Sequence, residues 1–239
     1  MPPFRTHACH DKFTLIRERY MVLWLLMTAA GFLSGAVMYS YFIPKWFQNV
    51  DVRLGQEGAN PGSANAIAAA GLPIGLICLF LDLFKAFSPV FIAVTILDIR
   101  GMPLVPIIIA PVCGHAFSPF LRFRGGKAVA SSFGALLGAV WISRMIFVLV
   151  IAMLLFQFVL VFNPNSAKVL AGYACASAAA LIMEPLPEIK VAMLLICLVV
   201  CYKHVRNFNS GVLGLSVGPF SVRYEEHEFK FIGPRGIKK

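Results

Sequence analysis

The chain has 239 residues, of which 59% are hydrophobic and only 13% are charged. Soluble domains are typically about 45–50% apolar and about 25% charged, so this composition excludes an ordinary soluble core and indicates a protein solvated mainly by lipid. The formal net charge is +10. The basic residues lie in short clusters between apolar runs, which favours anionic head groups or phosphorylated substrates over nucleic acid as partners.

Long apolar runs dominate the chain, and a membrane-spanning helix needs about 20 mostly apolar residues. The pattern predicts an all-α polytopic membrane protein of about seven transmembrane helices. No repeat or linker interrupts it, so we expect one membrane-embedded domain over 1–239, with a polar N-terminal segment at 1–19 and a basic cytoplasmic tail at 203–239. The predicted spans are Tyr20–Ile43, Ala66–Leu97, Met102–Ala116, Ala128–Ile142, Met145–Phe162, Ser166–Met183 and Glu188–Tyr202.

The order of these spans places the polar loops at 45–65, 114–127 and 163–168 on the same side of the membrane as the tail. Most of the lysines and arginines lie on that side. Because cytoplasmic loops carry an excess of lysine and arginine, we expect this side, including the C-terminus, to be cytoplasmic. The basic N-terminal segment favours the inverted orientation, which stays open as an alternative.

The first polar loop is rich in glycine and asparagine. These residues adopt unusual backbone angles and can direct amide N–H groups toward a phosphate. A flexible, turn-rich loop without a ligand is the alternative. The candidate binding residues in this loop are Arg53, Asn60, Gly62, Ser63 and Asn65.

The second polar loop ends in Arg124-Gly-Gly-Lys127, immediately before a predicted helix. Backbone amides at a helix N-terminus bind anions, and Lys127 would add a positive charge. The spacing is not that of a Walker A loop. A basic membrane anchor is the alternative. The candidates here are His115, Ser118, Arg124, Gly125, Gly126 and Lys127.

Two further pairs of polar residues are spaced by three positions. His204 and Asn207 share a helix face at the end of the last span, where they could orient a hydroxyl group or a phosphate oxygen. Asp82 and Lys85 lie within a span. Ionisable residues in such a place form either a structural ion pair or part of a functional site. No catalytic triad, HExxH motif or Cys/His metal spacing is present, so we expect neither a metal site nor a cofactor.

Together these segments resemble the bacterial acyl-phosphate-dependent glycerol-3-phosphate 1-O-acyltransferase family from about Gly35 to Gly211. Asp51-Val-Arg53 and Asn60-Pro-Gly-Ser-Ala-Asn65 are similar to a family motif that reads approximately DIR, then NPGATN. Leu81-Asp82-Leu-Phe-Lys85 resembles LDxxKG. The segment from Gly114 to Ala130 resembles GHxFPxF followed by FKGGKGVA, and His204-x-x-Asn207 resembles HxxN.

The resemblance implies a seven-helix inner-membrane enzyme of phospholipid biosynthesis. It would transfer an acyl group from acyl phosphate to the 1-hydroxyl of glycerol 3-phosphate, giving lysophosphatidic acid and phosphate, with the bilayer delivering the acyl chain. Lys127, Asn60 and the glycine amides would hold the phosphoryl group, and Arg53 would bind the acceptor's anion. His204 and Asn207 would orient the hydroxyl, and Lys127 would stabilise developing charge.

The sequence departs from the family pattern in the part of the site expected to bind the acceptor. Ala68 and Ser210 stand where the family has arginines, and no glutamate follows Ser210 at the family's position. Ala128 replaces a glycine, and Ala36 replaces a serine. Two alternatives therefore stay open: a divergent membrane acyltransferase with a different acceptor, and a non-catalytic transporter or assembly protein.

Overall fold

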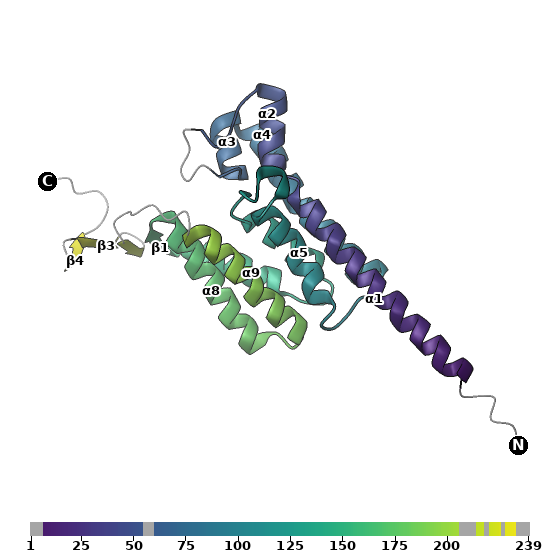
Figure 1. Cartoon of the computed structure of the whole chain (residues 1–239). Coiled ribbons are helices and arrows are strands. Elements are labelled where there is room, and N and C mark those ends of the chain that lie inside the picture. Colours follow the sequence, from purple (N-terminus) through teal and green to yellow (C-terminus); the bar gives the residue numbers. More distant parts are fainter. Residues whose placement is uncertain (1–6, 55–59, 206–213, 218–219, 226–227, 233–239) are drawn as a thin grey trace, which may run out of the picture.

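The computed structural model describes residues 7–54, 60–205, 214–217, 220–225 and 228–232 (Figure 1). Its main body is a bundle of helices, so the predicted all-α polytopic membrane fold is confirmed for this body. Within the described residues, four segments are long and apolar enough to cross a membrane, namely Glu18–Gln48, Leu72–Ile96, Leu104–Leu121 and Asn165–Met183. Val129–Gly138 and Met145–Val159 are shorter apolar helices.

Each predicted span contains at least one helix of the structure. In chain order the α-helices are α1 (His7–Ala36), α2 (Tyr39–Gln48), α3 (Ser63–Ala70), α4 (Leu72–Phe91), α5 (Leu104–Ala116), α6 (Val129–Gly138), α7 (Met145–Leu154), α8 (Asn165–Met183) and α9 (Pro187–Val205). One π-helical turn, Ile92–Ile96, extends α4, and another, Leu155–Val159, extends α7. A short 3₁₀ turn, η3 (Pro119–Leu121), follows α5.

Two predicted spans are each divided into two helices. The run predicted at Ala66–Leu97 breaks at Gly71, whose φ of 87° suits glycine, and Pro73 lies in the first turn of α4. The run predicted at Tyr20–Ile43 breaks between α1 and α2. There Ser118 Oγ donates to the Ala36 carbonyl and Lys85 Nζ donates to the Val37 carbonyl, which replaces the helical hydrogen bonds lost at the break.

Glycines bring pairs of helices into backbone contact. A Cβ on Gly35 of α1 would lie 2.2 Å from the Pro111 carbonyl oxygen of α5, and one on Gly134 of α6 would lie 2.1 Å from the Leu83 oxygen of α4. Such small residues let membrane helices approach closely, where van der Waals packing drives their association. In Figure 1, α1 runs beside α5, and α8 and α9 lie side by side on the other side of α5.

The bundle has two polar ends, which we call the distal end and the cavity end. At the distal end, Gly101 N donates to Glu188 Oε1 at 3.1 Å, and Ser143 Oγ donates to Glu184, so the turns before α5, α7 and α9 are held together. The α5 and α9 helices then run to the cavity end, where Lys203 Nζ donates to the Ala116 carbonyl at 2.9 Å.

A small antiparallel sheet was not predicted. It consists of β1 (Leu160–Asn163), β2 (Gly214–Val217), β3 (Phe220–Glu225) and β4 (Glu228–Ile232), in that order. The end of the predicted Met145–Phe162 span is therefore strand, and part of the predicted tail pairs with it. Alternation of apolar and polar residues in β3 and β4 was the available signal, but the basic charge of the tail obscured it.

Candidate active site

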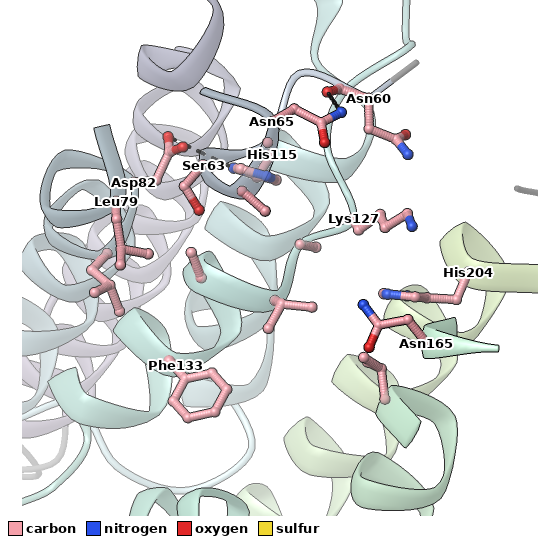
Figure 2. A pocket seen from close by; sticks show the side chains of 17 residues that line it. Asn60, Ser63, Asn65, Leu79, Asp82, His115, Lys127, Phe133, Asn165 and His204 are labelled. Atoms are coloured by element: carbon pink, nitrogen blue, oxygen red, sulfur yellow. Dashed lines mark hydrogen bonds and ion pairs between the residues drawn. The ribbon is translucent and has the colours of Figure 1, made fainter. Parts of the chain in front are cut away.

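A cavity of about 620 Å³ opens at the cavity end of the bundle (Figure 2). Its walls come from the start of α3, the middle of α4, the end of α5, the start of α6, the start of α8 and the end of α9. The lining residues are Asn60, Gly62, Ser63, Ala64, Asn65, Leu79, Asp82, Leu83, His115, Lys127, Ala128, Val129, Ala130, Phe133, Asn165, Val169 and His204. Segments far apart in the sequence thus meet at one cavity, which agrees with the predicted placement of the polar loops on one side.

The α3 side of the cavity is built from the asparagine and glycine loop. Asn65 Nδ2 donates to the Asn60 carbonyl oxygen at 2.8 Å, and Gly62 N donates to the same oxygen at 2.9 Å. A Cβ added to Gly62 would meet no atom within 4 Å, because this residue borders open space. The start of α3 therefore presents a compact, hydrogen-bonded backbone turn to the cavity.

Lys127, His204 and Asn165 form the opposite polar wall. Figure 2 shows the Lys127 and His204 side chains pointing toward one another, with Asn165 beside His204. His204 Nδ1 lies 2.8 Å from the Val200 carbonyl oxygen. As a carbonyl only accepts, Nδ1 is the protonated nitrogen, and Nε2 of the neutral ring is left as a proton acceptor.

Asn165 is a site residue that the sequence analysis missed. It is the first residue of α8 and lines the cavity. The sequence shows it in an Asn163-Pro164-Asn165 turn, which is an ordinary turn composition. The only available signal was that this turn falls on the same side as the polar loops.

Gly125 and Gly126 lie outside the cavity lining and have a packing role in this structure. Gly126 N donates to the His115 carbonyl oxygen at 3.0 Å, so that amide is engaged within the protein. A Cβ would lie 2.0 Å from the His115 oxygen at Gly125 and 2.3 Å from His115 Nε2 at Gly126. The two glycines therefore let the loop lie directly on the end of α5, which brings Lys127 to the cavity.

A buried ionic network lies beneath the polar end of the cavity. Lys85 Nζ is 2.7 Å from Asp82 Oδ1, and both side chains are almost fully buried. Ser40 Oγ donates to the other Asp82 oxygen. His115 Nδ1 is 3.9 Å from Asp82 Oδ1 and makes no hydrogen bond within the described residues. Asp82 and His115 border the cavity, whereas Lys85 does not, and its charge is compensated by Asp82.

Arg53 lies outside the cavity lining and is bound by its own loop. Its guanidinium contacts Asp51 through Nε at 2.9 Å and Nη2 at 2.6 Å, and it stacks 4.5 Å from the Tyr41 ring centroid. Hydrogen bonds from Arg53 lower the pKa of the Asp51 carboxyl below its ordinary value. In this conformation Arg53 stabilises the loop and does not reach the cavity.

Among the other predicted site residues, Ser118 and Arg124 do not line the cavity. Ser118 is fully buried and donates from Oγ to the Ala36 carbonyl at 2.6 Å. Arg124 is exposed and does not line the cavity. Asn207 lies outside the described residues, so its predicted role stays a prediction. The cavity lining combines one lysine, two histidines, three asparagines and Asp82, which is paired with Lys85. Lys127, the His204 acceptor and the asparagine amides form a set suited to binding an anion and orienting a hydroxyl group.

The fold and this cavity define a polytopic membrane protein with a polar, lysine-bearing site at one end of its bundle. Residues 25–213 match the family described as glycerol-3-phosphate acyltransferase. This match covers most of the chain, and the chain therefore belongs to that family. The resemblance inferred from the motifs is confirmed.

Curated relatives include three bacterial glycerol-3-phosphate acyltransferases. Glycerol-3-phosphate acyltransferase 2 of Thermotoga maritima is 42% identical over 53% of this chain and 63% of its own length. The Legionella pneumophila protein is 32% identical over 79% of this chain and 66% of its own length. The Staphylococcus haemolyticus protein is 31% identical over 67% of this chain and 80% of its own length. The chain thus spans less than two thirds of the T. maritima relative.

Two solved structures share the fold. Both are crystal structures of PlsY (YgiH), an integral membrane glycerol 3-phosphate acyltransferase. The glycerol 3-phosphate form has a TM-score of 0.68 at 24% identity and covers 77% of this chain and 89% of the PlsY chain. The lysophosphatidic acid form has a TM-score of 0.64 at the same identity. At this identity the likeness shows a common membrane fold.

Proposed function

We propose that this protein transfers an acyl group from acyl phosphate to the 1-hydroxyl of glycerol 3-phosphate, releasing lysophosphatidic acid and inorganic phosphate. Membership of the acyltransferase family supports this reaction. The single structural observation that carries it is the convergence of Lys127, Asn60 and His204 on one cavity. The cavity end then faces the cytoplasm of a bacterial inner membrane, as the loop charges predict.

The donor is already activated, because phosphate is a good leaving group, so no protein nucleophile is needed. The acceptor oxygen attacks the acyl carbonyl carbon, the new ester bond forms, and the bond from that carbon to the phosphate oxygen breaks. Phosphate leaves with the bonding electron pair. The hydroxyl proton passes to the departing phosphate or to His204 Nε2, the nitrogen left as an acceptor by the bond to Val200.

The residues of the cavity act by position and charge. Lys127 stabilises negative charge on the phosphoryl group, and Asn60 and Asn65 border the same space. His204 and Asn165 orient the acceptor from the opposite wall. The apolar walls at Leu79, Leu83, Val129, Phe133 and Val169 offer a surface for the first carbons of the acyl chain.

A direct assay tests this proposal. The full chain, purified in phosphatidylcholine nanodiscs, is given palmitoyl phosphate and glycerol 3-phosphate, and lysophosphatidic acid and released phosphate are measured together. We expect equal amounts of both products, turnover lowered by about 10²-fold or more in Lys127→Ala and His204→Ala, and full turnover in Arg144→Gln at the distal end. A folded protein without turnover would refute the proposal and favour a non-catalytic role, and a Lys127→Ala variant as active as the wild type would refute the role of Lys127.

A different acceptor is the second candidate, and the position of Arg53 favours it. Glycerol 3-phosphate and acyl phosphate each carry a phosphate, but within the described lining residues Lys127 is the one lysine or arginine. Arg53 is held by Asp51 instead. Offering glycerol 3-phosphate, dihydroxyacetone phosphate and glycerol in parallel with one acyl phosphate separates the two. Faster transfer to glycerol would identify an uncharged acceptor.

A further inference from the structure

Four exposed aromatic and arginine side chains lie on a six-residue loop that begins with η3 and precedes Gly125, Gly126 and the cavity lysine, Lys127. We call Pro119–Arg124 the aromatic–arginine loop. Phe120 is 57% exposed and Phe123 is 64% exposed, and Arg122 and Arg124 are also exposed. The two arginine side chains make no hydrogen bond or ion pair with the described part of the chain. Neither the apolar rings nor the positive charges are satisfied within the bundle.

The outward direction of these side chains is built into the backbone. Phe123 N donates to the Ser118 carbonyl at 2.8 Å, and Leu121 N donates to the same oxygen at 3.1 Å. Arg122 and Phe123 have φ values of 53° and 62°, a left-handed conformation that residues with large side chains rarely adopt. Arg122 and Phe123 are consecutive strained residues in a hydrogen-bonded turn. The turn therefore fixes the outward direction of their side chains.

The loop is placed where the membrane surface meets the site. The apolar segment of α5 ends at Leu121, within the loop, so the loop lies at the level of the lipid head groups. The aromatic–arginine loop continues directly into Gly125 and Gly126, which rest on His115, and then into Lys127 in the cavity wall. At the end of α2, Trp46 and Phe47 are 75% and 77% exposed beside the exposed Lys45.

Aromatic rings beside basic side chains fit the surface of a bilayer that contains anionic lipids. The rings prefer the boundary between head groups and acyl chains, and arginine binds phosphate through paired hydrogen bonds. A soluble acidic protein would match the arginines but would leave no role for rings at the end of a membrane span. The positive charge of the arginines and the location of the rings at the end of a span therefore favour an anionic lipid surface as the binding partner.

We propose that the aromatic–arginine loop binds anionic phospholipid, with Phe120 and Phe123 inserted at the level of the head groups and Arg122 and Arg124 on lipid phosphates. Because the loop leads into Lys127, bound lipid holds that lysine in the cavity wall and increases turnover. The second part rests on the proposed acyl transfer, whereas lipid binding does not.

Lipid preference is measured first, without any assay of turnover. The full chain is equilibrated with phosphatidylcholine and phosphatidylglycerol, and retained lipids are counted by native mass spectrometry. The test variant is Arg122→Gln combined with Phe123→Asn, because asparagine tolerates a left-handed φ and so removes the ring with little change of backbone. The control is Arg144→Gln, which removes an exposed arginine at the distal end.

We expect the wild type and Arg144→Gln to retain phosphatidylglycerol preferentially and the double variant to lose this preference. Equal retention of both lipids by the wild type, equal loss in Arg144→Gln, or displacement of the lipid by millimolar inorganic phosphate would overturn the proposal. The last result would identify a site for soluble anions.

Turnover is then compared in nanodiscs with and without phosphatidylglycerol. Anionic lipid should raise phosphate release several-fold in the wild type and in Arg144→Gln but not in the double variant, which should match the wild type in phosphatidylcholine alone. Preferential retention without lipid stimulation would refute the coupling to Lys127. Preferential retention without turnover in any lipid would instead refute the proposed acyl transfer.

Discussion

Both ends of the bundle contain polar side chains. Those at the distal end are hydrogen-bonded within the protein, whereas several of those at the cavity end line the cavity. At the distal end, Glu184 accepts hydrogen bonds from Ser143 Oγ and Leu186 N, and Glu188 accepts one from Gly101 N. At the cavity end, the Lys127 and His204 side chains line the cavity, although His204 Nδ1 also lies 2.8 Å from the Val200 carbonyl oxygen. Polar groups that are costly to bury persist in a membrane protein when the protein pairs them or when a ligand uses them. The comparison therefore separates structural polar residues from those available to a substrate.

Lys85 provides the strongest test of this separation, because it lies at the cavity end but is paired like a residue of the distal end. Lys85→Met leaves Asp82 buried and charged without its ammonium partner. Removing one partner of a buried pair costs about 3–5 kcal/mol, so we expect the largest loss of stability from this variant. Unfolding in a graded series of detergent mixtures measures it.

The matched control is the double variant Asp82→Asn with Lys85→Met. Neutralising both groups removes the uncompensated charge, and most of the lost stability should return. If the double variant is as unstable as Lys85→Met alone, the ion pair is not what Lys85 contributes. A Lys85→Met variant that unfolds like the wild type but fails to bind donor would restore the predicted substrate-binding role.

Lys127 should show the opposite behaviour. Lys127→Ala is expected to lower turnover by about 10²–10³-fold, the typical effect of removing one preorganised group that stabilises transition-state charge. Its unfolding should change far less than that of Lys85→Met, because the Lys127 side chain is only half-buried at the cavity wall, whereas Lys85 is almost fully buried. A loss of stability as large as that of Lys85→Met would show that Lys127 is also a structural residue and would remove the contrast.

The sequence predicted the membrane body and most of the polar residues of the cavity wall because both depend on patterns along the chain. Apolar runs locate helices through the cost of exposing backbone in lipid. The glycine and asparagine loop, Lys127 and His204 were found from their composition and position. Asp82 and Lys85 were found as a pair, but their full burial and the hydrogen bond to Asp82 from Ser40, 42 positions away, follow no local pattern.

The sequence could not distinguish contacts that depend on three-dimensional packing. The sequence predicted that Gly125 and Gly126 bind phosphate, but their close packing against His115 by itself accounts for a glycine at each position. Arg53 read as an anion ligand, yet Asp51, two residues earlier, binds it. Asn165 read as a turn residue until α8 and α9 placed it beside His204. In each case the role depends on a contact that only the folded structure shows.

Glu184 tests the distal end with a smaller expected effect. Glu184→Ala removes the acceptor of the buried Ser143 hydroxyl and of Leu186 N. A buried donor left unsatisfied costs about 1–3 kcal/mol. We expect lower stability in detergent, with the KM for both substrates unchanged, because no distal-end residue reaches the cavity. A changed KM with normal stability would mean that the two ends are not separate in function.

Ala128 offers the smallest expected effect and tests the geometry of the cavity wall itself. It is the N-cap residue directly before α6 and has a φ of 61°, where alanine is strained by about 1–2 kcal/mol and glycine is not. Ala128→Gly relieves that strain, but it gives up a buried methyl group worth about 0.8 kcal/mol and adds about 0.4–1 kcal/mol of unfolded-state entropy.

These contributions nearly cancel, so we expect Ala128→Gly to change the free energy of unfolding by less than about 0.5 kcal/mol. Ala135→Gly is the matched comparison, because Ala135 is also fully buried but lies inside α6. It relieves no strain and should cost about 1.5–2 kcal/mol from helix propensity and the lost methyl group. Equal costs at the two positions would show that Ala128 is not left-handed in the membrane, and the path by which the loop delivers Lys127 to the cavity would then differ from the one described.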